Sequence, residues 1–345
     1  MKTFIKTVPN KYCQICKKNG LILYFSLSDK FFNNSGRWNI LYCKKCKISW
    51  IDPIPINSDT GKLYPANYRT NINNGKIKRI FGNIKDRIVA SILCYKFGYQ
   101  YSADSLGLWN LLSKITIVKD YIGRRISWVE FKKNGKLLDI GCGTGGFIEE
   151  MKKLGWNVTG IEIDKKAANI AKLRVGSEFI INRQLKESNL LEASYDVITL
   201  LHVFEHLSQP IDTLKICLKL LKPDGKIVIN TPNINSLGHI LFKKNWMPLE
   251  VPRHFFLYSP KGLRECIESV NLEVQEMWTS TYISNFVWNT SIIIKRRGNL
   301  TNGRLPEPLS LSHKATSLLF KIIETILNIF VPVGEEVILI AKKKC

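Results

Sequence analysis

The spacing of apolar residues changes along the chain, and this change predicts where strands and helices lie. From residue 136 onward, short and mainly apolar runs alternate with stretches in which apolar residues recur every three or four positions. The runs predict strands at residues 136–140, 157–163, 177–181, 195–201 and 226–231. The stretches between them predict helices at 146–154, 165–173 and 211–221, the last closed by residues 223–225. Such alternation is typical of a parallel α/β sheet, which we expect to be the core.

The C-terminal part of the chain departs from this alternation. A predicted helix at 259–269 leads into a strand at 272–278, and a last strand follows at 335–344. These two strands should form an antiparallel hairpin, which makes residues 279–334 an insertion at the substrate edge of the sheet. Within it an apolar stripe at helical spacing comprises Leu318, Leu319, Ile322, Ile323, Ile326 and Ile329. We expect a helix there that either packs on the core as a lid or touches lipid or a lipid-linked acceptor.

Two cysteine pairs mark the N-terminal region. Cys13 and Cys16 form one Cys-x-x-Cys pair, and Cys43 and Cys46 form the other. Four thiolates complete a tetrahedral zinc site and leave no position for water, so a bound Zn²⁺ would be structural. The long spacing between the pairs favours an elaborated zinc ribbon or a treble clef, and two redox pairs are the alternative. We therefore predict a zinc-binding module at 1–66, a basic helical segment at 67–130 and the α/β domain at 131–345.

A glycine-rich turn follows the first strand of the α/β domain. Gly141, Gly143 and Gly145 let backbone N–H groups approach a ligand without an intervening Cβ, and Gly141, Gly143 and Gly146 also satisfy a dinucleotide-binding pattern. Asp139 decides between the two ligands, because at the strand end it would repel a pyrophosphate. The same carboxylate suits the ammonium group of an aminoacyl moiety, which S-adenosylmethionine carries.

A second acid ends the next strand. Glu162 is placed to accept hydrogen bonds from both ribose hydroxyls, which indicates nucleoside binding without choosing between the two cofactors. Ile163 beside it is expected to pack on the adenine.

The sequence of the α/β domain resembles a known family. LDIGCGTGGF, GIEID, SYDVITLLHVFEHL and LKPDGKIVINTPN, in this order, resemble the class I S-adenosylmethionine-dependent methyltransferases, and most of all the branch of the ubiquinone-biosynthesis O-methyltransferases. The cysteine region resembles the zinc-binding head of bacterial methyltransferases of polysaccharide and secondary-metabolite pathways, and VPRHFFLYSPKGL resembles a segment of the same group. Sugar C-methyltransferases with such a head carry a long further domain, which favours O-methylation here.

The resemblance implies a Rossmann-like, seven-stranded, mostly parallel sheet with an antiparallel last strand. It implies cofactor contacts at Asp139, Gly141, Gly143, Gly145 and Glu162, with Leu201 and His202 beside the methionine part. Glu205 and His206 match a Glu-His pair of the family. The ubiquinone enzymes have an acid at the position of His202, in a cluster proposed to bind a divalent ion, so a second metal here is left open.

Three histidines follow strands at the edge where open α/β sheets bind ligands: His202, His206 and His254. Methyl transfer depends mainly on positioning, but a hydroxyl acceptor, with a pKa of about 10 even for a phenol, benefits from a general base. We favour His254 or His206 as this base. Arg253 is expected to hold an anionic group on the acceptor.

The net positive charge of the chain bears on its binding partners. The chain has 51 Lys and Arg against 28 Asp and Glu, a formal net charge of +23, which favours anionic partners. Codon bias in an AT-rich genome is the alternative explanation for part of the excess. The basic segment 76–99 and the insertion predict peripheral contact with an acidic membrane or an anionic acceptor. The acceptor itself, a small molecule, a sugar or a lipid-linked glycan, is not fixed by the sequence, nor is the oligomeric state.

Two other functions compete with this interpretation. An RNA methyltransferase would also carry zinc and basic charge, but the fourth-strand loop lacks the Asn/Asp-Pro-Pro-aromatic motif, so nucleic acid is disfavoured. A non-catalytic zinc protein that binds the cofactor or nucleic acid is the third possibility, against which the intact glycine loop argues. The chain shows no signal-peptide pattern and no uncharged apolar span of bilayer length, and its other cysteines are scattered, so we expect a cytoplasmic enzyme.

Overall fold

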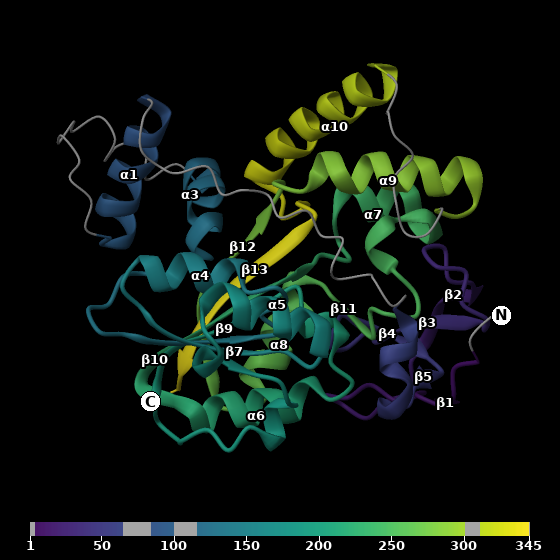
Figure 1. Cartoon of the computed structure of the whole chain (residues 1–345). Coiled ribbons are helices and arrows are strands. Elements are labelled where there is room, and N and C mark those ends of the chain that lie inside the picture. Colours follow the sequence, from purple (N-terminus) through teal and green to yellow (C-terminus); the bar gives the residue numbers. More distant parts are fainter. Residues whose placement is uncertain (1–3, 65–83, 100–115, 301–310, 345) are drawn as a thin grey trace. The chain divides into compact units, whose positions relative to one another are not determined.

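A seven-stranded sheet forms the centre of the protein. The computed structural model describes residues 4–64, 84–99, 116–300 and 311–344 (Figure 1). The strand order is β12-β13-β10-β9-β6-β7-β8. The strands are β6 (Lys136–Ile140), β7 (Asn157–Ile161), β8 (Ile180–Ile181), β9 (Tyr195–Leu201), β10 (Leu221–Pro232), β12 (Leu272–Ser280) and β13 (Glu336–Lys343). β6 runs parallel to β7 and β9, whereas β12 and β13 are antiparallel, which confirms the predicted Rossmann-like sheet.

Helices connect the strands largely where the sequence predicts them. They are α4 (Gly146–Lys153), α5 (Lys165–Val175), α6 (Pro210–Leu220) and α8 (Pro260–Glu268). Asp164 caps α5, and its side chain accepts a hydrogen bond from the Ala167 N–H. Ser259 caps α8, and its hydroxyl accepts from the Gly262 N–H. Side-chain caps of this kind satisfy backbone donors that the first helical turn leaves unpaired.

Several predicted boundaries are wrong, and β7 ends at Ile161, two residues before its predicted end. α6 ends at Leu220 and β10 begins at Leu221, five residues before the predicted strand, so Pro223 lies in the strand and does not terminate the helix. The apolar residues at this junction suit either element, and periodicity therefore does not separate them. β8 is also shorter than predicted, because residues 177–179 form the 3₁₀ helix η3 (Ser177–Phe179).

The chain divides into two compact units. One comprises residues 1–66, 202–218 and 229–345, and the other comprises residues 67–201 and 219–228. The second unit includes α1 (Ile84–Phe97) and α3 (Thr116–Gly123), which lie in the predicted basic segment. Short 3₁₀ helices complete the connections: η1 (Asn57–Leu63), η2 (Arg124–Ile126), η4 (Leu185–Glu187), η5 (Phe204–His206), η6 (Lys243–Asn245) and η7 (Met247–Leu249).

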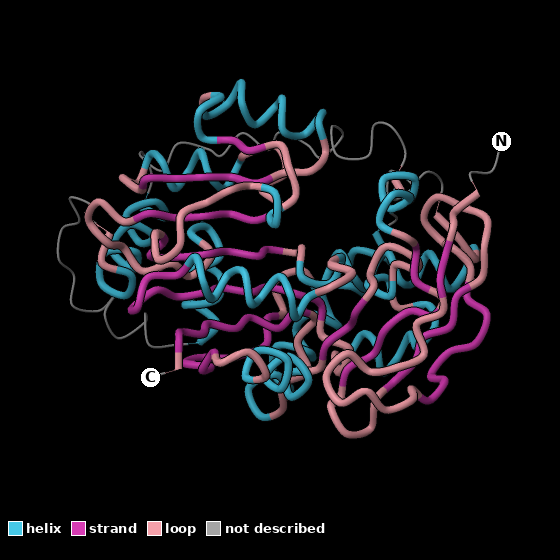
Figure 2. The backbone as a smooth tube through the Cα atoms, turned by 90° about the horizontal axis from the view of Figure 1, so that it is seen from below, coloured by secondary structure: helices cyan, strands magenta, loops and turns pink. Residues whose placement is uncertain are grey.

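The cysteine region belongs to a four-stranded sheet of the first unit. Its order is β11-β4-β3-β2, with β2 (Leu21–Leu27), β3 (Trp38–Tyr42), β4 (Ile48–Asp52) and β11 (Phe256–Tyr258), while β1 (Thr7–Val8) pairs with β5 (Ile54–Pro55). β11 pairs antiparallel with β4, so that Phe256 lies opposite Trp50. Trp38 and Trp50 are fully buried beneath this sheet. The N-terminal region therefore shares its sheet with a strand that follows β10 in the sequence. Figure 2 shows the strands near the N-terminus in magenta.

The insertion between β12 and β13 is helical. It contains α9 (Ser284–Arg297) and α10 (Leu311–Phe330), which pack on each other, and α7 (Leu237–Phe242) contacts α9 (Figure 1). Among the described residues, no helix has both the length and the apolar character required to cross a bilayer.

Candidate functional site

The glycine loop between β6 and α4 adopts a backbone that other residues rarely take. Gly141, Gly143 and Gly145 have φ angles of 74°, 57° and 79°. A Cβ added at Gly143 would meet no atom within 4 Å, whereas a Cβ at Gly145 would lie 3.0 Å from the Cβ of Ala171 on α5. Conformation alone therefore requires glycine at 143, and conformation together with close helix packing requires it at 145. The open space beside Gly143 leaves room for a ligand.

Asp139 ends β6 as a buried carboxyl group. Its side chain is 3% exposed, and its Oδ1 accepts a hydrogen bond from the Thr199 hydroxyl at 2.6 Å. Burial raises the pKa of Asp139 to about 7, an effect that the hydrogen bond from Thr199 opposes and the charge of Glu162 reinforces. A cationic group bound beside this carboxyl would stabilise its ionised form. The site therefore fits the predicted ammonium ligand.

Glu162 connects the glycine loop to the end of β7. Its Oε2 accepts from the Gly143 N–H at 2.9 Å, and its Oε1 accepts from the Asp164 N–H at 2.8 Å. These two bonds orient the carboxylate beside the glycine loop. Ile163 is 61% exposed, which leaves its side chain open to a flat ring. Asp139, the glycine loop, Glu162 and Ile163 lie in one unit.

His202, the residue after β9, lies between two buried carboxylates. Its Nε2 is 2.7 Å from Oε1 of Glu336, and its Nδ1 is 3.6 Å from Oε1 of Glu205. Burial would lower the pKa of His202, but these carboxylates raise it to about 10. A charged imidazolium has no lone pair with which to take a proton. This geometry therefore argues against His202 as the predicted base. The side chains of His202 and Leu201 are partly exposed, so both can still contact the cofactor.

His206 and His254 form a pair of neutral rings in edge-to-face contact, with centroids 4.6 Å apart. Nδ1 of His254 bonds to the carbonyl of Pro248 at 2.6 Å, and Nδ1 of His206 bonds to the carbonyl of Arg253 at 3.0 Å. A carbonyl only accepts, so each Nδ1 carries the proton and each Nε2 keeps its lone pair. Nε2 of His254 lies 3.6 Å from Oε2 of Glu250. Burial lowers the pKa of both rings to about 4.

Glu205 completes a group that has the chemistry of a metal centre. Glu205, His206 and His254 each offer one ligand atom, and these three atoms lie within 4.8 Å of one another. Against the effect of burial, the hydrogen bond from His202 lowers the pKa of Glu205 to about 2, so the group is a carboxylate. Histidines that ligate metals usually donate their other ring N–H to a carbonyl or carboxylate, as both rings do here. The three side chains therefore suit either proton transfer or a divalent ion.

Arg253 is engaged by the protein itself. Its guanidinium is fully buried and donates to both carboxylate oxygens of Asp29, at 2.7 and 2.9 Å, and to Glu250 at 3.0 Å. An anionic group on the acceptor would have to compete with these two carboxylates. The contacts support a structural role for Arg253, and the predicted substrate role has no support in them.

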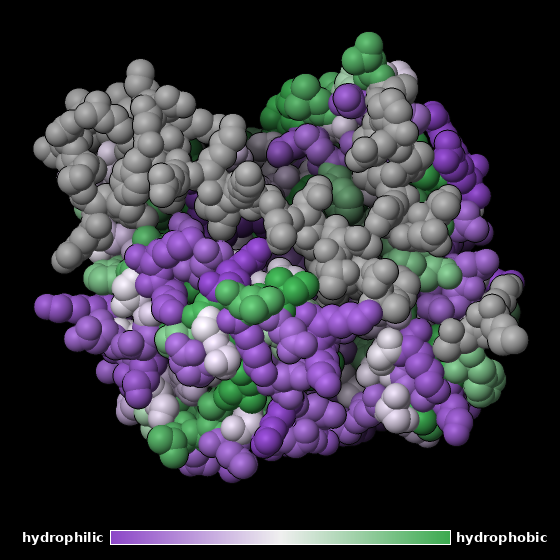
Figure 3. Space-filling view, viewed as in Figure 1, coloured by the Kyte–Doolittle hydropathy of each residue, from purple (hydrophilic) through white to green (hydrophobic). Residues whose placement is uncertain are grey.

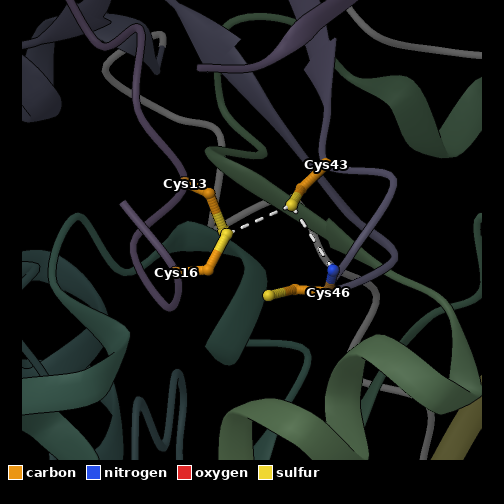
Figure 4. A group of neighbouring side chains, drawn as sticks. All are labelled: Cys13, Cys16, Cys43 and Cys46. Carbon is orange, nitrogen blue, oxygen red and sulfur yellow. Dashed lines mark hydrogen bonds between the residues drawn. The ribbon is translucent and has the colours of Figure 1, made fainter. Parts of the chain in front are cut away.

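The four cysteines of the N-terminal region converge (Figure 4). Their sulfur atoms lie within 4.8 Å of one another, and the Cys16 and Cys43 sulfurs are 3.5 Å apart, well beyond the roughly 2.05 Å of a disulfide bond. The two pairs sit on matching turns. In each, the residue after the second cysteine has a positive φ, 60° at Lys17 and 55° at Lys47, and its N–H bonds back to the carbonyl of the first cysteine.

The thiols of this cluster have pKa values that depend on burial. Burial raises the pKa of Cys13 to about 11 and that of Cys46 further. Burial would also raise the pKa of Cys16, but the backbone N–H of Lys18 and the neighbouring sulfurs lower it to about 7. A divalent cation among the four sulfurs would favour the thiolate form of all of them. The donor set and its geometry therefore fit Zn²⁺.

Four residues around these groups were not singled out from the sequence: Thr199, Glu336, Asp29 and Asn230. Asn230 donates its side-chain N–H to Oε1 of Glu336 at 3.0 Å. Thr199 and Asn230 lie inside apolar strands, where one polar residue gives no distinctive pattern. Glu336 is the first residue of the last strand and follows another acid, and this pair of acids was the available signal.

Comparisons with known proteins agree with this geometry. Residues 117–277 match the family model of a methyltransferase domain. A ubiquinone biosynthesis O-methyltransferase of Pseudomonas aeruginosa is 30% identical over 188 residues, which span 50% of this chain and 81% of that protein. One of Erwinia tasmaniensis is 29% identical over 176 residues, which span 48% of this chain and 70% of that protein.

Solved structures of methyltransferases also resemble the chain. An S-adenosylmethionine-dependent methyltransferase of Archaeoglobus fulgidus matches with a TM-score of 0.43 and 21% identity, over 66% of this chain and 93% of that one. A geranyl diphosphate C-methyltransferase of Streptomyces coelicolor matches with a TM-score of 0.45 and 10% identity, over 70% of this chain and 86% of that one. Neither likeness is close enough to carry an argument about the substrate.

Proposed function

The chain belongs to the class I S-adenosylmethionine-dependent methyltransferases, and from this premise we propose that it methylates a hydroxyl oxygen of a small-molecule, sugar or lipid-linked glycan acceptor. The similarity to O-methyltransferases is the observation that carries the choice of oxygen. The N-terminal cysteine region resembles the zinc-binding head of methyltransferases of polysaccharide pathways. This resemblance favours a glycan or a related metabolite as the acceptor.

The cofactor occupies the β6–α4 edge in this proposal. Asp139 faces the ammonium group of S-adenosylmethionine, and the backbone of Gly141, Gly143 and Gly145 lies against its methionine part. Glu162 accepts the ribose hydroxyls and Ile163 packs on the adenine. The buried carboxyl of Asp139 supports this arrangement, since it would repel the pyrophosphate of a dinucleotide.

The acceptor proton is handled by Glu205, His206 and His254. A neutral Nε2 on each ring can take the proton of a hydroxyl, and the adjacent Glu205 carboxylate stabilises the imidazolium that forms. The same three side chains would hold a divalent ion if one binds, and a bound cation would lower the pKa of the acceptor hydroxyl. Metal content distinguishes these two roles.

A structural Zn²⁺ at Cys13, Cys16, Cys43 and Cys46 completes the proposal. The four sulfurs satisfy tetrahedral zinc without water, and the ion would hold together the turns that precede β2 and β4. Thiolate ligands persist in a reducing compartment, so we place the enzyme in the cytoplasm.

Turnover on defined acceptors tests this function. Incubation with labelled S-adenosylmethionine and a panel of phenols, sugars and lipid-linked glycans should label a hydroxyl oxygen of one class. His254→Ala should slow that reaction by roughly 10²–10⁴-fold if His254 is the base. Label found in RNA and in none of these acceptors would contradict the proposal.

A further inference from the structure

Helix α10 carries its apolar side chains on the outside. The six residues of the apolar stripe, Leu318, Leu319, Ile322, Ile323, Ile326 and Ile329, are between 39% and 64% exposed. Apolar residues gather over this helix in the space-filling view (Figure 3). The interpretation of the stripe as core packing is therefore wrong. A run of exposed Leu and Ile of this length marks a surface that binds another protein or a membrane.

The opposite face of α10 is mainly polar and contacts the protein, and Phe320 on this face stacks on Trp288 of α9. Ser317 accepts a hydrogen bond from Asn289 of α9 at 3.1 Å, and the Asn328 side chain donates to the Thr279 carbonyl at 2.8 Å. Glu324 on the same face is fully buried. A helix that covers a soluble core turns its apolar side inward and its polar side outward. α10 does the reverse, so its outer face is suited to an apolar environment beyond this chain.

Cations gather where α9 ends and α10 begins. α9 ends with exposed Lys295, Arg296 and Arg297. In the first turn of α10, His313 bonds to Arg296 and Lys314 is exposed. Glu324 is the one acidic residue in α9 and α10, both of which the structure describes from end to end, and it is buried. The surface of this helix pair therefore offers apolar groups and positive charge together. An acidic lipid headgroup layer is complementary to this positive charge.

We propose that the α9–α10 pair docks on an acidic phospholipid bilayer, with α10 lying in the interface along its length. Helices with an apolar face and cationic flanks bind membranes in this way, with the apolar side inserted to the depth of the headgroups. α10 has 20 residues and does not qualify as a membrane span. The inference goes beyond the proposed methyl transfer, because no proposed cofactor or acceptor group lies on this surface. It does not rest on the basic segment 76–99, in which Lys76, Lys78 and Arg79 lie outside the described residues.

Vesicle flotation of the full-length protein tests the proposal. The probes are phosphatidylcholine vesicles with and without phosphatidylglycerol, each at low and high salt. The wild type should float with acidic vesicles, and binding should weaken with salt, because exposed charges are screened. Ile322→Ser with Ile326→Ser should reduce binding at least tenfold. Lys295→Gln with Arg297→Gln should reduce it roughly fivefold for each cation removed.

Matched controls change the same residue types on other exposed helices. Leu173→Ser on α5 and Lys215→Gln on α6 should bind vesicles like the wild type. Circular dichroism and S-adenosylmethionine binding report whether each variant is folded, and cofactor binding also separates this proposal from the proposed function. The proposal is overturned if folded wild-type protein ignores acidic vesicles at low salt, or if both pairs of variants float like the wild type. A concentration-dependent dimer that Ile322→Ser with Ile326→Ser dissolves, in a protein that ignores vesicles, would assign the stripe to a second copy.

Discussion

Thr199 of β9 donates its hydroxyl to the carboxyl group of Asp139 at the end of β6, at 2.6 Å. Burial nevertheless raises the pKa of Asp139 to about 7, so this carboxyl exchanges its proton near neutral pH when no ligand is bound. In the unfolded chain the group ionises near pH 3.9. The native state therefore binds the proton more tightly between these two values, and the contribution of Asp139 to stability falls as pH rises from about 4 to about 7.

The first prediction concerns cofactor affinity and pH. Ionised Asp139 attracts the ammonium group, so the affinity for S-adenosylmethionine should rise as pH increases through about 7. It should fall again above about 8, where a free α-amino group loses its proton. Calorimetric titration from pH 5.5 to 9 measures this profile. Asp139→Asn should remove the rise on the acid side, and an identical profile in both proteins would show that another group controls it.

The second prediction concerns His202. Its carboxylate neighbours raise its pKa to about 10, above the value of about 6.5 in an unfolded chain. The stability that this imidazolium contributes should be complete below pH 6.5 and lost as pH rises through 10. Thermal unfolding of wild type and His202→Gln should therefore differ most at pH 6 and converge towards pH 10. A difference that stays constant with pH would mean that His202 is neutral in the native state.

The third prediction is one tightly bound zinc ion in each chain. Elemental analysis of purified protein should give a ratio near one, and Cys43→Ser should lose the ion and unfold at a lower temperature. Cys94→Ser, which changes a cysteine outside the cluster, should keep both the ion and the wild-type unfolding temperature. A ratio near two that returns to one in His206→Ala would place a second ion at Glu205, His206 and His254. Metal-free protein with unchanged stability would rule out the zinc site.

The fourth prediction separates the two roles of Arg253. Arg253→Met leaves the buried Asp29 carboxylate without its partner and should lower the free energy of unfolding by about 3–5 kcal/mol. Arg253→Met with Asp29→Leu removes both charges and should be less destabilised than Arg253→Met alone. Urea unfolding measures both variants. If Arg253→Met instead keeps its stability and raises only the KM for the acceptor, the substrate role inferred from the sequence is correct.

The strands of the central sheet could be predicted because each is a buried apolar run with its own flanking turn. β6 and β9 have the predicted bounds, and the glycine loop follows β6 as predicted. β7 begins where predicted and ends at Ile161, so Glu162 is the residue after it. These groups are close in sequence to the strands that position them, so local pattern is enough.

Long-range partners could not be predicted in the same way. His202 and Glu336 meet because β13 brings the chain back beside β10, and nothing in the local sequence of either residue indicates the other. Asp29 and Arg253 meet through the pairing of β4 with β11 in one sheet. The spacing of apolar residues in α10 gives the width of its apolar face, but it does not tell whether that face points towards the protein or away from it.

The central claim is that Asp139 and Glu162 bind S-adenosylmethionine, and isothermal titration calorimetry of the cofactor tests it most directly. Wild-type protein should bind one equivalent, and Asp139→Asn and Glu162→Gln should each weaken binding roughly ten- to hundredfold, as expected for a lost hydrogen bond to a charged group. Leu173→Ser, an exposed substitution on α5, should bind like the wild type. Unchanged affinity in both carboxylate variants, or no binding by folded wild-type protein, would contradict this account.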